Sequence, residues 1–132
     1  KKYLQQAVAV ANYLLSHPNL PADKIPYWDF DAAPGEKTYR DASAGSIMAS
    51  ALLELAQYVG KKEKAQYLAA AETMLTSLAS GKYRAMAGQN GGFVLMHSVG
   101  HLTNNSEVDV PLTYADYYFL EALGRYKKWY LK

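Results

Sequence analysis

The chain lacks cysteine, long apolar runs and any strong net charge, and each absence removes a class of function. Without cysteine, its 132 residues can form neither disulfides nor thiolate metal sites. This leaves the compartment open, since periplasmic and cytoplasmic proteins can both lack cysteine. No stretch approaches the roughly 20 apolar residues of a membrane-spanning helix. The net charge of +2, with acids and bases interspersed, gives no reason to expect nucleic acid or a membrane as partner.

The composition is that of a folded domain. Half of the residues are hydrophobic (50%) and 20% are charged, far from the composition of disordered chains. The sequence opens with Lys1-Lys2-Tyr3-Leu4, which reads as the middle of a helix without a preceding cap or initiator methionine. We therefore expect residues 1–132 to be a single partial domain, cut from a longer chain.

Apolar residues spaced three and four apart predict four helices. The first covers residues 3–15, the second runs from Asp41 to Val59, and the third spans about 63–80. The last follows Asp109-Val110-Pro111, because proline is tolerated in a first helical turn. Small residues on several faces of the second helix indicate an inner helix with close neighbours.

Two long loops, residues 18–40 and 81–108, separate these helices. Within the second loop, Phe93–Met96 could form a short strand. Loops of this length are usually functional or disordered, and the aromatic residues of the first loop argue against disorder. The fold class predicted is all-α, built from helical hairpins with at most a trace of strand.

The first loop carries aromatic residues interleaved with carboxylates, in the segment Pro26-Tyr27-Trp28-Asp29-Phe30-Asp31. Sugar-binding sites often have this composition, because apolar sugar faces stack on aromatic rings while carboxylates accept hydrogen bonds from hydroxyls. Alternatively, the aromatic rings fill the core and the aspartates cap helix ends. Residue types alone leave both readings open.

Asp41 begins the predicted second helix, and it also has two readings. Its carboxylate can cap the helix by accepting hydrogen bonds from the free amides of the first turn. It can also belong to a binding site, paired with the neighbouring Arg40.

The segment His97-Ser98-Val99-Gly100-His101 is the third candidate site. Two histidines four residues apart could bind a metal on a helix, but glycine argues against a helix and no third ligand is fixed by spacing. We therefore expect no metal and no cofactor. Ser98 and His101 could instead donate hydrogen bonds to a substrate, or the segment could anchor a loop. No nucleophile-elbow motif and no phosphate-binding glycine loop is present.

Five segments together form a pattern that covers nearly the whole chain: Trp28–Asp31, Arg40–Ala44, Met48–Leu55, His97–Gly100 and Glu107–Leu123. In this order they closely resemble glycoside hydrolase family 88, the unsaturated glucuronyl hydrolases. The resemblance implies an (α/α)6 toroid of six helical hairpins, of which this chain would be the C-terminal third.

The resemblance also implies an unusual reaction and substrate. In that family an aspartic acid protonates the C4=C5 double bond of a 4,5-unsaturated uronic acid, water adds at C5, and the hemiketal opens with loss of the glycosidic bond. The substrates are oligosaccharides left by polysaccharide lyases. The family's catalytic aspartates lie in motifs upstream of the first loop, and residues 1–132 have no counterpart of these motifs.

We therefore assign no catalytic residue to this chain and expect the acid upstream of Lys1. The residues expected to bind substrate or support the site are Trp28, Asp29, Asp31, Arg40, Asp41, His97, Ser98 and His101. Family members that prefer sulfated substrates tend to carry a second serine and a lysine where this chain has His101, Leu102 and Thr103, so the resemblance leaves a preference for sulfated sugars open.

Two alternatives remain at this stage. The chain could belong to an unsaturated rhamnogalacturonyl hydrolase, another (α/α)6 enzyme, or it could be a non-catalytic helical module that binds carbohydrate or protein. Because isolated hairpins of a toroid would expose apolar faces, we also expect self-association or binding to the missing N-terminal part of the toroid.

Overall fold

The computed structural model describes residues 1–31 and 38–131. It contains four α-helices, as predicted: α1 (Lys2–Ser16), α2 (Ala42–Leu55), α3 (Lys61–Ala79) and α4 (Thr113–Trp129). A two-stranded antiparallel sheet joins β1 (Ser98–His101) to β2 (Ser106–Val110), and two short 3-10 helices, η1 (Asn90–Gly92) and η2 (Leu102–Asn104), lie in the loops. No helix in the described ranges is long and apolar enough to cross a bilayer.

Two helix boundaries differ from the prediction. Helix α2 ends at Leu55 rather than Val59, because the amides of Gln57 and Tyr58 turn back to carbonyls three residues earlier, at 3.0 Å each. Helix α4 begins at Thr113, so the placement of Pro111 in its first turn is wrong. Leu112 is the N-cap and its carbonyl accepts from the Ala115 amide at 3.0 Å.

The strand prediction for Phe93–Met96 is also wrong. Leu95 makes only an isolated bridge to Arg84, and the strands lie further along the chain. The physical reason is that a side chain takes two backbone donors in the middle of this segment. The carboxylate of Asp116 accepts from the amides of Val94 (2.7 Å) and Leu95 (2.8 Å).

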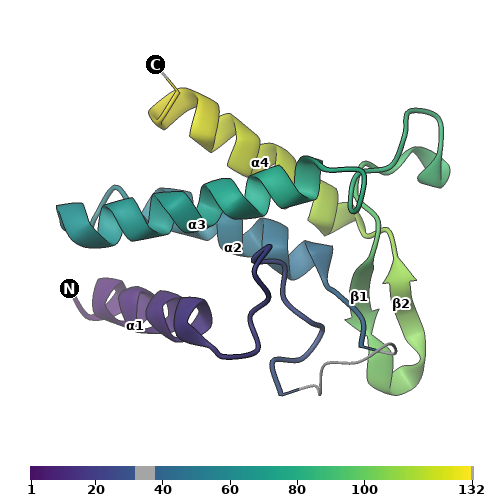
Figure 1. Ribbon diagram of the computed structural model, residues 1–132, viewed down its shortest axis with the longest axis horizontal. Helices are drawn as coiled ribbons and strands as arrows, with labels where there is room; N and C mark the ends of the chain where they lie inside the picture. The colour runs from purple at the N-terminus through teal and green to yellow at the C-terminus, as the bar shows by residue number, and fades with distance from the viewer. Residues whose placement is uncertain (32–37, 132) are drawn as a thin grey trace.

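Helices α2 and α3 form an antiparallel hairpin at the centre, with α4 on one side and α1 on the other (Figure 1). The prediction that α2 is an inner helix agrees with its burial, since nine of its 14 residues are buried. Small residues allow the close approach. A Cβ atom at Gly45 would lie 2.8 Å from Cδ1 of Ile25, so glycine lets the first long loop pack onto α2.

The contact between α2 and α4 combines apolar packing with a polar cluster. Phe119 of α4 is buried in the core. Further along the same helix, Arg125 donates to the carbonyl of Ser50 at 2.9 Å and pairs with Glu54 at 2.7 Å. The Ser50 hydroxyl donates to the carboxylate of Glu121. The cluster satisfies polar groups that the helix contact would otherwise leave without partners.

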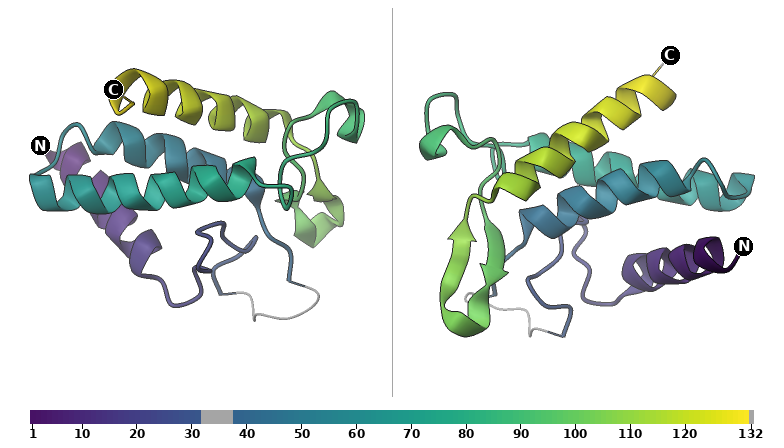
Figure 2. Two further views of the ribbon diagram at one scale, coloured as in Figure 1. Left: turned by 45° about the horizontal axis from the view of Figure 1, so that its top comes forward. Right: turned by 180° about the vertical axis from the view of Figure 1, so that it is seen from behind.

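The two long loops and the β1–β2 hairpin gather at one end of the molecule, where α2 and α4 begin (Figure 2). The short turn between α2 and α3 and both chain termini lie toward the other end (Figure 1). We call the loop end the rim. The first rim loop comprises the described residues between α1 and α2, and the second rim loop comprises residues 80–97.

Candidate functional site

The first rim loop is closed at its base by backbone hydrogen bonds. The amide of Trp28 donates to the carbonyl of Tyr39 at 2.9 Å, and the amide of Asp41 donates to Pro26 at the same distance. Tyr27 and Arg40 form an isolated antiparallel bridge between these contacts. The loop therefore returns to α2 as a short pair of extended segments, which holds residues 26–28 near the start of that helix.

Asp41 is an N-cap and also a link between α2 and the β1–β2 hairpin. Its carboxylate accepts from the amide (2.9 Å) and hydroxyl (2.6 Å) of Ser43, and from the amide of Val99 in β1 at 3.4 Å. The amide of Ala42 donates to the carbonyl of His97 at 3.0 Å. The capping reading is thus confirmed, and the same carboxylate ties the hairpin to α2.

The predicted pairing of Arg40 with Asp41 is wrong. The Arg40 guanidinium pairs with Asp23, its Nε donates to the carbonyl of Ile25 at 2.9 Å, and it lies over the Tyr27 ring at 5.1 Å from the centroid. Asp41 does not take this partner because its carboxylate is already occupied by the amide and hydroxyl of Ser43 and by the amide of Val99.

The aromatic-carboxylate segment divides into anchored and exposed parts. Phe30 packs edge-on against His17 at 4.8 Å between centroids, and its carbonyl accepts from Asn19 at 2.7 Å. Trp28 is half-buried, whereas Asp29 and Asp31 are exposed and share one local turn, in which Asp29 accepts from the Asp31 amide at 2.9 Å. Phe30 thus serves the fold, and the two carboxylates stay open to a ligand.

The three residues of the histidine segment lie in different surroundings. His97 has a left-handed backbone (φ 63°) and pairs through Nδ1 with Asp109 at 2.7 Å. Ser98 is fully buried, and its hydroxyl has no hydrogen-bond partner among the described residues. His101 is exposed and contacts Asn104 at 3.3 Å. In the described ranges, no group of three metal-ligating side chains could hold a metal ion.

An acidic patch lies where the hairpin meets the starts of α2 and α4. The side chain of Glu107 crosses over Gly100, where an added Cβ would lie 2.9 Å from the Cβ of Glu107. Burial raises the pKa of the Tyr114 phenol. The charges of Asp41 and Glu107 raise it further, against a hydrogen bond with Ser43. At position 100 glycine is required, because the side chain of Glu107 occupies the space that a larger residue would need.

Asp23 is the main rim residue that the sequence did not reveal. Besides Arg40, its carboxylate binds Lys82 (2.9 Å) and the hydroxyl of Tyr83 (3.0 Å). Burial pushes the pKa of Asp23 up, but Lys82, Arg40, the Ile25 amide and Tyr83 together outweigh burial and lower that pKa. Its partners are far apart in the sequence, so no local pattern points to them.

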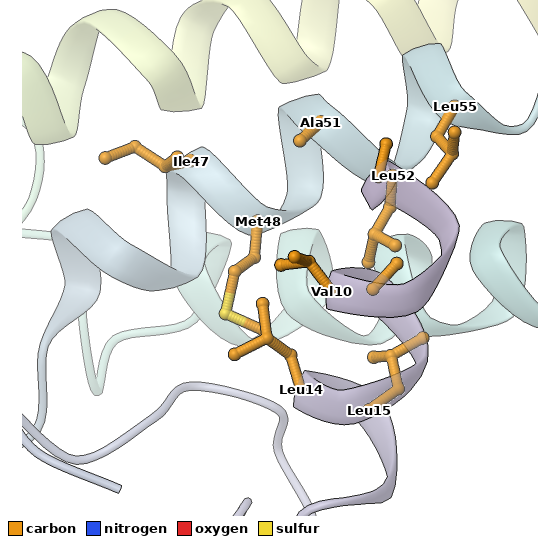
Figure 3. A pocket seen from close by; sticks show the side chains of 10 residues that line it. Val10, Leu14, Leu15, Ile47, Met48, Ala51, Leu52 and Leu55 are labelled. Carbon is orange, nitrogen blue, oxygen red and sulfur yellow. The ribbon is translucent and has the colours of Figure 1, made fainter. Parts of the chain in front are cut away.

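A recess lies away from the rim, between α1 and α2. It has a volume of about 370 Å³. All of its lining residues have apolar side chains, and Val10 and Leu14 of α1 face Met48 and Leu52 of α2 across it (Figure 3). The complete lining is Ala7, Val10, Ala11, Leu14, Leu15, Ile47, Met48, Ala51, Leu52 and Leu55. A recess without polar side chains cannot orient a sugar, so this α1–α2 groove is separate from the candidate sugar site at the rim.

Known proteins match this chain along almost its whole length. An unsaturated glucuronyl hydrolase of Formosa agariphila is 45% identical over 131 residues, which are 99% of this chain and 32% of that protein. An unsaturated chondroitin disaccharide hydrolase of Streptococcus agalactiae is 35% identical over 125 residues, 92% of this chain and 31% of that protein. No family model matches the sequence.

A solved structure agrees with these relatives. The crystal structure of an unsaturated glucuronyl hydrolase specific for heparin superposes with a TM-score of 0.91 at 49% identity, covering 96% of this chain and 34% of that one. Such structures are (α/α)6 toroids, so α1 to α4 form part of a six-hairpin glycosidase toroid, as predicted.

The chain belongs to glycoside hydrolase family 88, the unsaturated glucuronyl hydrolases, and matches the C-terminal part of its relatives. It spans about a third of their length. These matches favour the glucuronyl reading over the rhamnogalacturonyl one.

Proposed function

We propose that this chain is part of a hydrolase that removes 4,5-unsaturated uronic acid from oligosaccharides left by polysaccharide lyases. The observation that carries the proposal is the match to unsaturated glucuronyl hydrolases over 99% of the chain. In the reaction, a proton adds at C4 and the hydroxyl of water adds at C5. The resulting hemiketal opens, and the bond to the rest of the oligosaccharide breaks.

In this proposal the chain supplies the rim of the site and the catalytic acid comes from outside residues 1–132. The exposed carboxylates of Asp29 and Asp31 accept hydrogen bonds from sugar hydroxyls, and half-buried Trp28 offers an apolar face for a sugar ring. His97 and His101 line the hairpin side, and the fully buried Ser98 supports it from within the fold.

Two rim residues take a supporting role in the proposal. The charged groups of Arg40 and Asp41 are paired or hydrogen-bonded within the protein, so we place both residues behind those that contact the substrate. They hold the first rim loop and the hairpin in position, whereas Trp28, Asp29 and Asp31 contact the sugar.

The substrate class follows from the relatives. One solved relative is specific for heparin, and a variant of the Streptococcus agalactiae enzyme was solved with an unsaturated disaccharide, dGlcA-GalNAc6S. We accordingly propose unsaturated disaccharides derived from glycosaminoglycans as substrates.

We also propose that helices from the rest of the toroid cover the α1–α2 groove. The relatives are about three times as long as this chain, and a helix of a toroid packs against neighbours on both sides. The groove offers only apolar side chains, which suits an amphipathic helix rather than a polar ligand. A chain without those helices is expected to self-associate through the same surface.

A chimera tests the proposed activity. This chain replaces the matching third of the Formosa agariphila enzyme, and the ultraviolet absorbance of the C4=C5 bond is followed with an unsaturated heparin or chondroitin disaccharide. We expect the absorbance to fall with the chimera. A folded chimera that leaves both disaccharides intact, while the unmodified Formosa enzyme consumes one of them, would overturn the proposed function.

A further inference from the structure

Asp23 occupies a junction between three parts of the chain. Its side chain is 25% exposed, and its carboxylate meets Arg40 from the first rim loop and Lys82 and Tyr83 from the second. Its carbonyl accepts from the hydroxyl of Ser77 in α3 at 2.9 Å. One acidic residue of the first rim loop thus contacts Arg40 in its own loop, the second rim loop and α3.

On the side of the first rim loop, Asp23 acts through Arg40 on the two extended segments, residues 26–28 and 39–41, that close the loop. The Arg40 side chain is 19% exposed, so its charge needs a counter-ion, and Asp23 is that counter-ion. With this pairing in place, Arg40 reaches back to the Ile25 carbonyl and covers the Tyr27 ring. Trp28 follows directly and donates its amide across the loop to Tyr39.

On the side of the second rim loop, Asp23 acts through Tyr83. This side chain is 1% exposed, and the carboxylate at 3.0 Å satisfies its buried hydroxyl. The Tyr83 carbonyl accepts from the Met96 amide at 2.8 Å, and its ring lies edge-on to His97 at 6.4 Å between centroids. His97 in turn pairs with Asp109 of β2, so the contacts extend into the hairpin.

We propose that Asp23 is a positioning residue that couples the two rim loops, setting the first through Arg40 and the second through Tyr83. The inference rests on the proposed function for its role in substrate binding. Asp23 itself does not touch the sugar. It acts by keeping the segment around Trp28 and the segment around His97 in register with each other.

The coupling is tested on this chain by amide hydrogen exchange with Asp23→Asn, which keeps the size and one acceptor oxygen but removes the charge. We expect the amides of Trp28 and Met96 to exchange about tenfold faster together, because both loops open when the junction is lost. Amides in the middle of α2 and α3 keep their rates. Faster exchange in one loop only, or in neither, would overturn the coupling.

The matched control is Glu63→Gln, the same acid-to-amide change on α3 at the end remote from the rim. It leaves the exchange of Trp28 and Met96 unchanged. If it accelerates both loops as much as Asp23→Asn does, the effect is one of net charge and the coupling is refuted.

The role in binding is tested in the chimera with the Formosa enzyme. We expect Asp23→Asn to raise KM about three- to tenfold with little change in kcat, because a disordered rim weakens substrate binding without touching the acid. A purely structural role would lower the melting temperature and leave the KM of the folded enzyme unchanged. An inactive unsubstituted chimera would overturn the proposed function, whereas an active chimera with unchanged KM in Asp23→Asn would overturn only the positioning role.

Discussion

Helix α2 is covered very differently on its two sides. Toward α4 it is sealed by buried apolar residues and by the cluster around Arg125. Toward α1 it leaves an apolar groove, and only Ala11 of α1 is buried. Both sides are rich in apolar residues, yet only one has a partner that fills it. The difference shows that burying one face of an inner helix does not complete its packing.

The largest effect is expected on the sealed side. Phe119→Ala removes a side chain that is 3% exposed and leaves a cavity between α4 and α2, which should lower the free energy of unfolding by about 3–5 kcal/mol. Urea unfolding followed by circular dichroism measures it. The neighbouring Leu120→Ala, at a position 58% exposed, should change stability by less than about 0.5 kcal/mol. Equal losses in the two variants would show that α4 is not sealed onto α2.

The polar cluster should matter less than the apolar core. Arg125→Met keeps the length of the side chain but leaves Glu54 and Glu121 without their cation, so unfolding should become easier by about 1.5–3 kcal/mol. Lys127→Met, on an exposed position of the same helix, is the control. If both variants unfold at the same urea concentration, the cluster contributes nothing to the sealed side.

At the rim end of α2, lowering the pH should remove a smaller part of the stability, the part that the ionised Asp23 contributes. The folded pKa of Asp23 is lowered from its usual 3.8, so its contribution is present above that value and disappears as pH falls through the folded pKa. The stability difference between the unsubstituted chain and Asp23→Asn should be roughly 1 kcal/mol or less near neutral pH and vanish in acid. A difference that stays constant into strong acid would contradict this origin.

On the open side, a substitution should change association and hardly change stability. Val10→Lys places a charge at the mouth of the groove, at a residue 46% exposed, and should shift the unfolding free energy by less than about 0.5 kcal/mol. The unsubstituted chain should sediment as an oligomer and Val10→Lys as a monomer. Gln6→Lys, on an exposed part of α1 outside the groove, should leave the oligomer intact. An unsubstituted chain that is a monomer with high thermal stability would contradict self-association through the groove.

Local patterns in the sequence predicted the helices and the cap well. The three-and-four spacing of apolar residues located all four helices, and Asp41 proved to be the N-cap of α2. These features depend on residues within a turn or two of one another, which a sequence displays directly. The family resemblance, also drawn from contiguous motifs, was confirmed.

Features that depend on distant residues were missed or misplaced. Arg40 was assigned to its neighbour Asp41, but its partner is 17 residues away, and Asp23 reaches Lys82 and Tyr83 across 59 and 60 residues. The strand at Phe93–Met96 failed because Asp116, more than 20 positions later, binds its amides. Of the expected site residues, Arg40 and Asp41 make their contacts within the protein, and their role at the site stays a prediction. The substrate roles of Trp28, Asp29, Asp31, His97, Ser98 and His101 stay predictions.

We propose that this chain supplies the rim and the groove of the toroid, whereas the catalytic acid comes from outside residues 1–132. The most direct test mixes this chain with a separately produced polypeptide, the part of the Formosa agariphila enzyme that lies outside the match, and follows the C4=C5 absorbance of an unsaturated disaccharide. We expect no loss of absorbance with either polypeptide alone and a loss with the mixture. Turnover by this chain alone would place a catalytic acid within residues 1–132 and contradict its proposed place outside them.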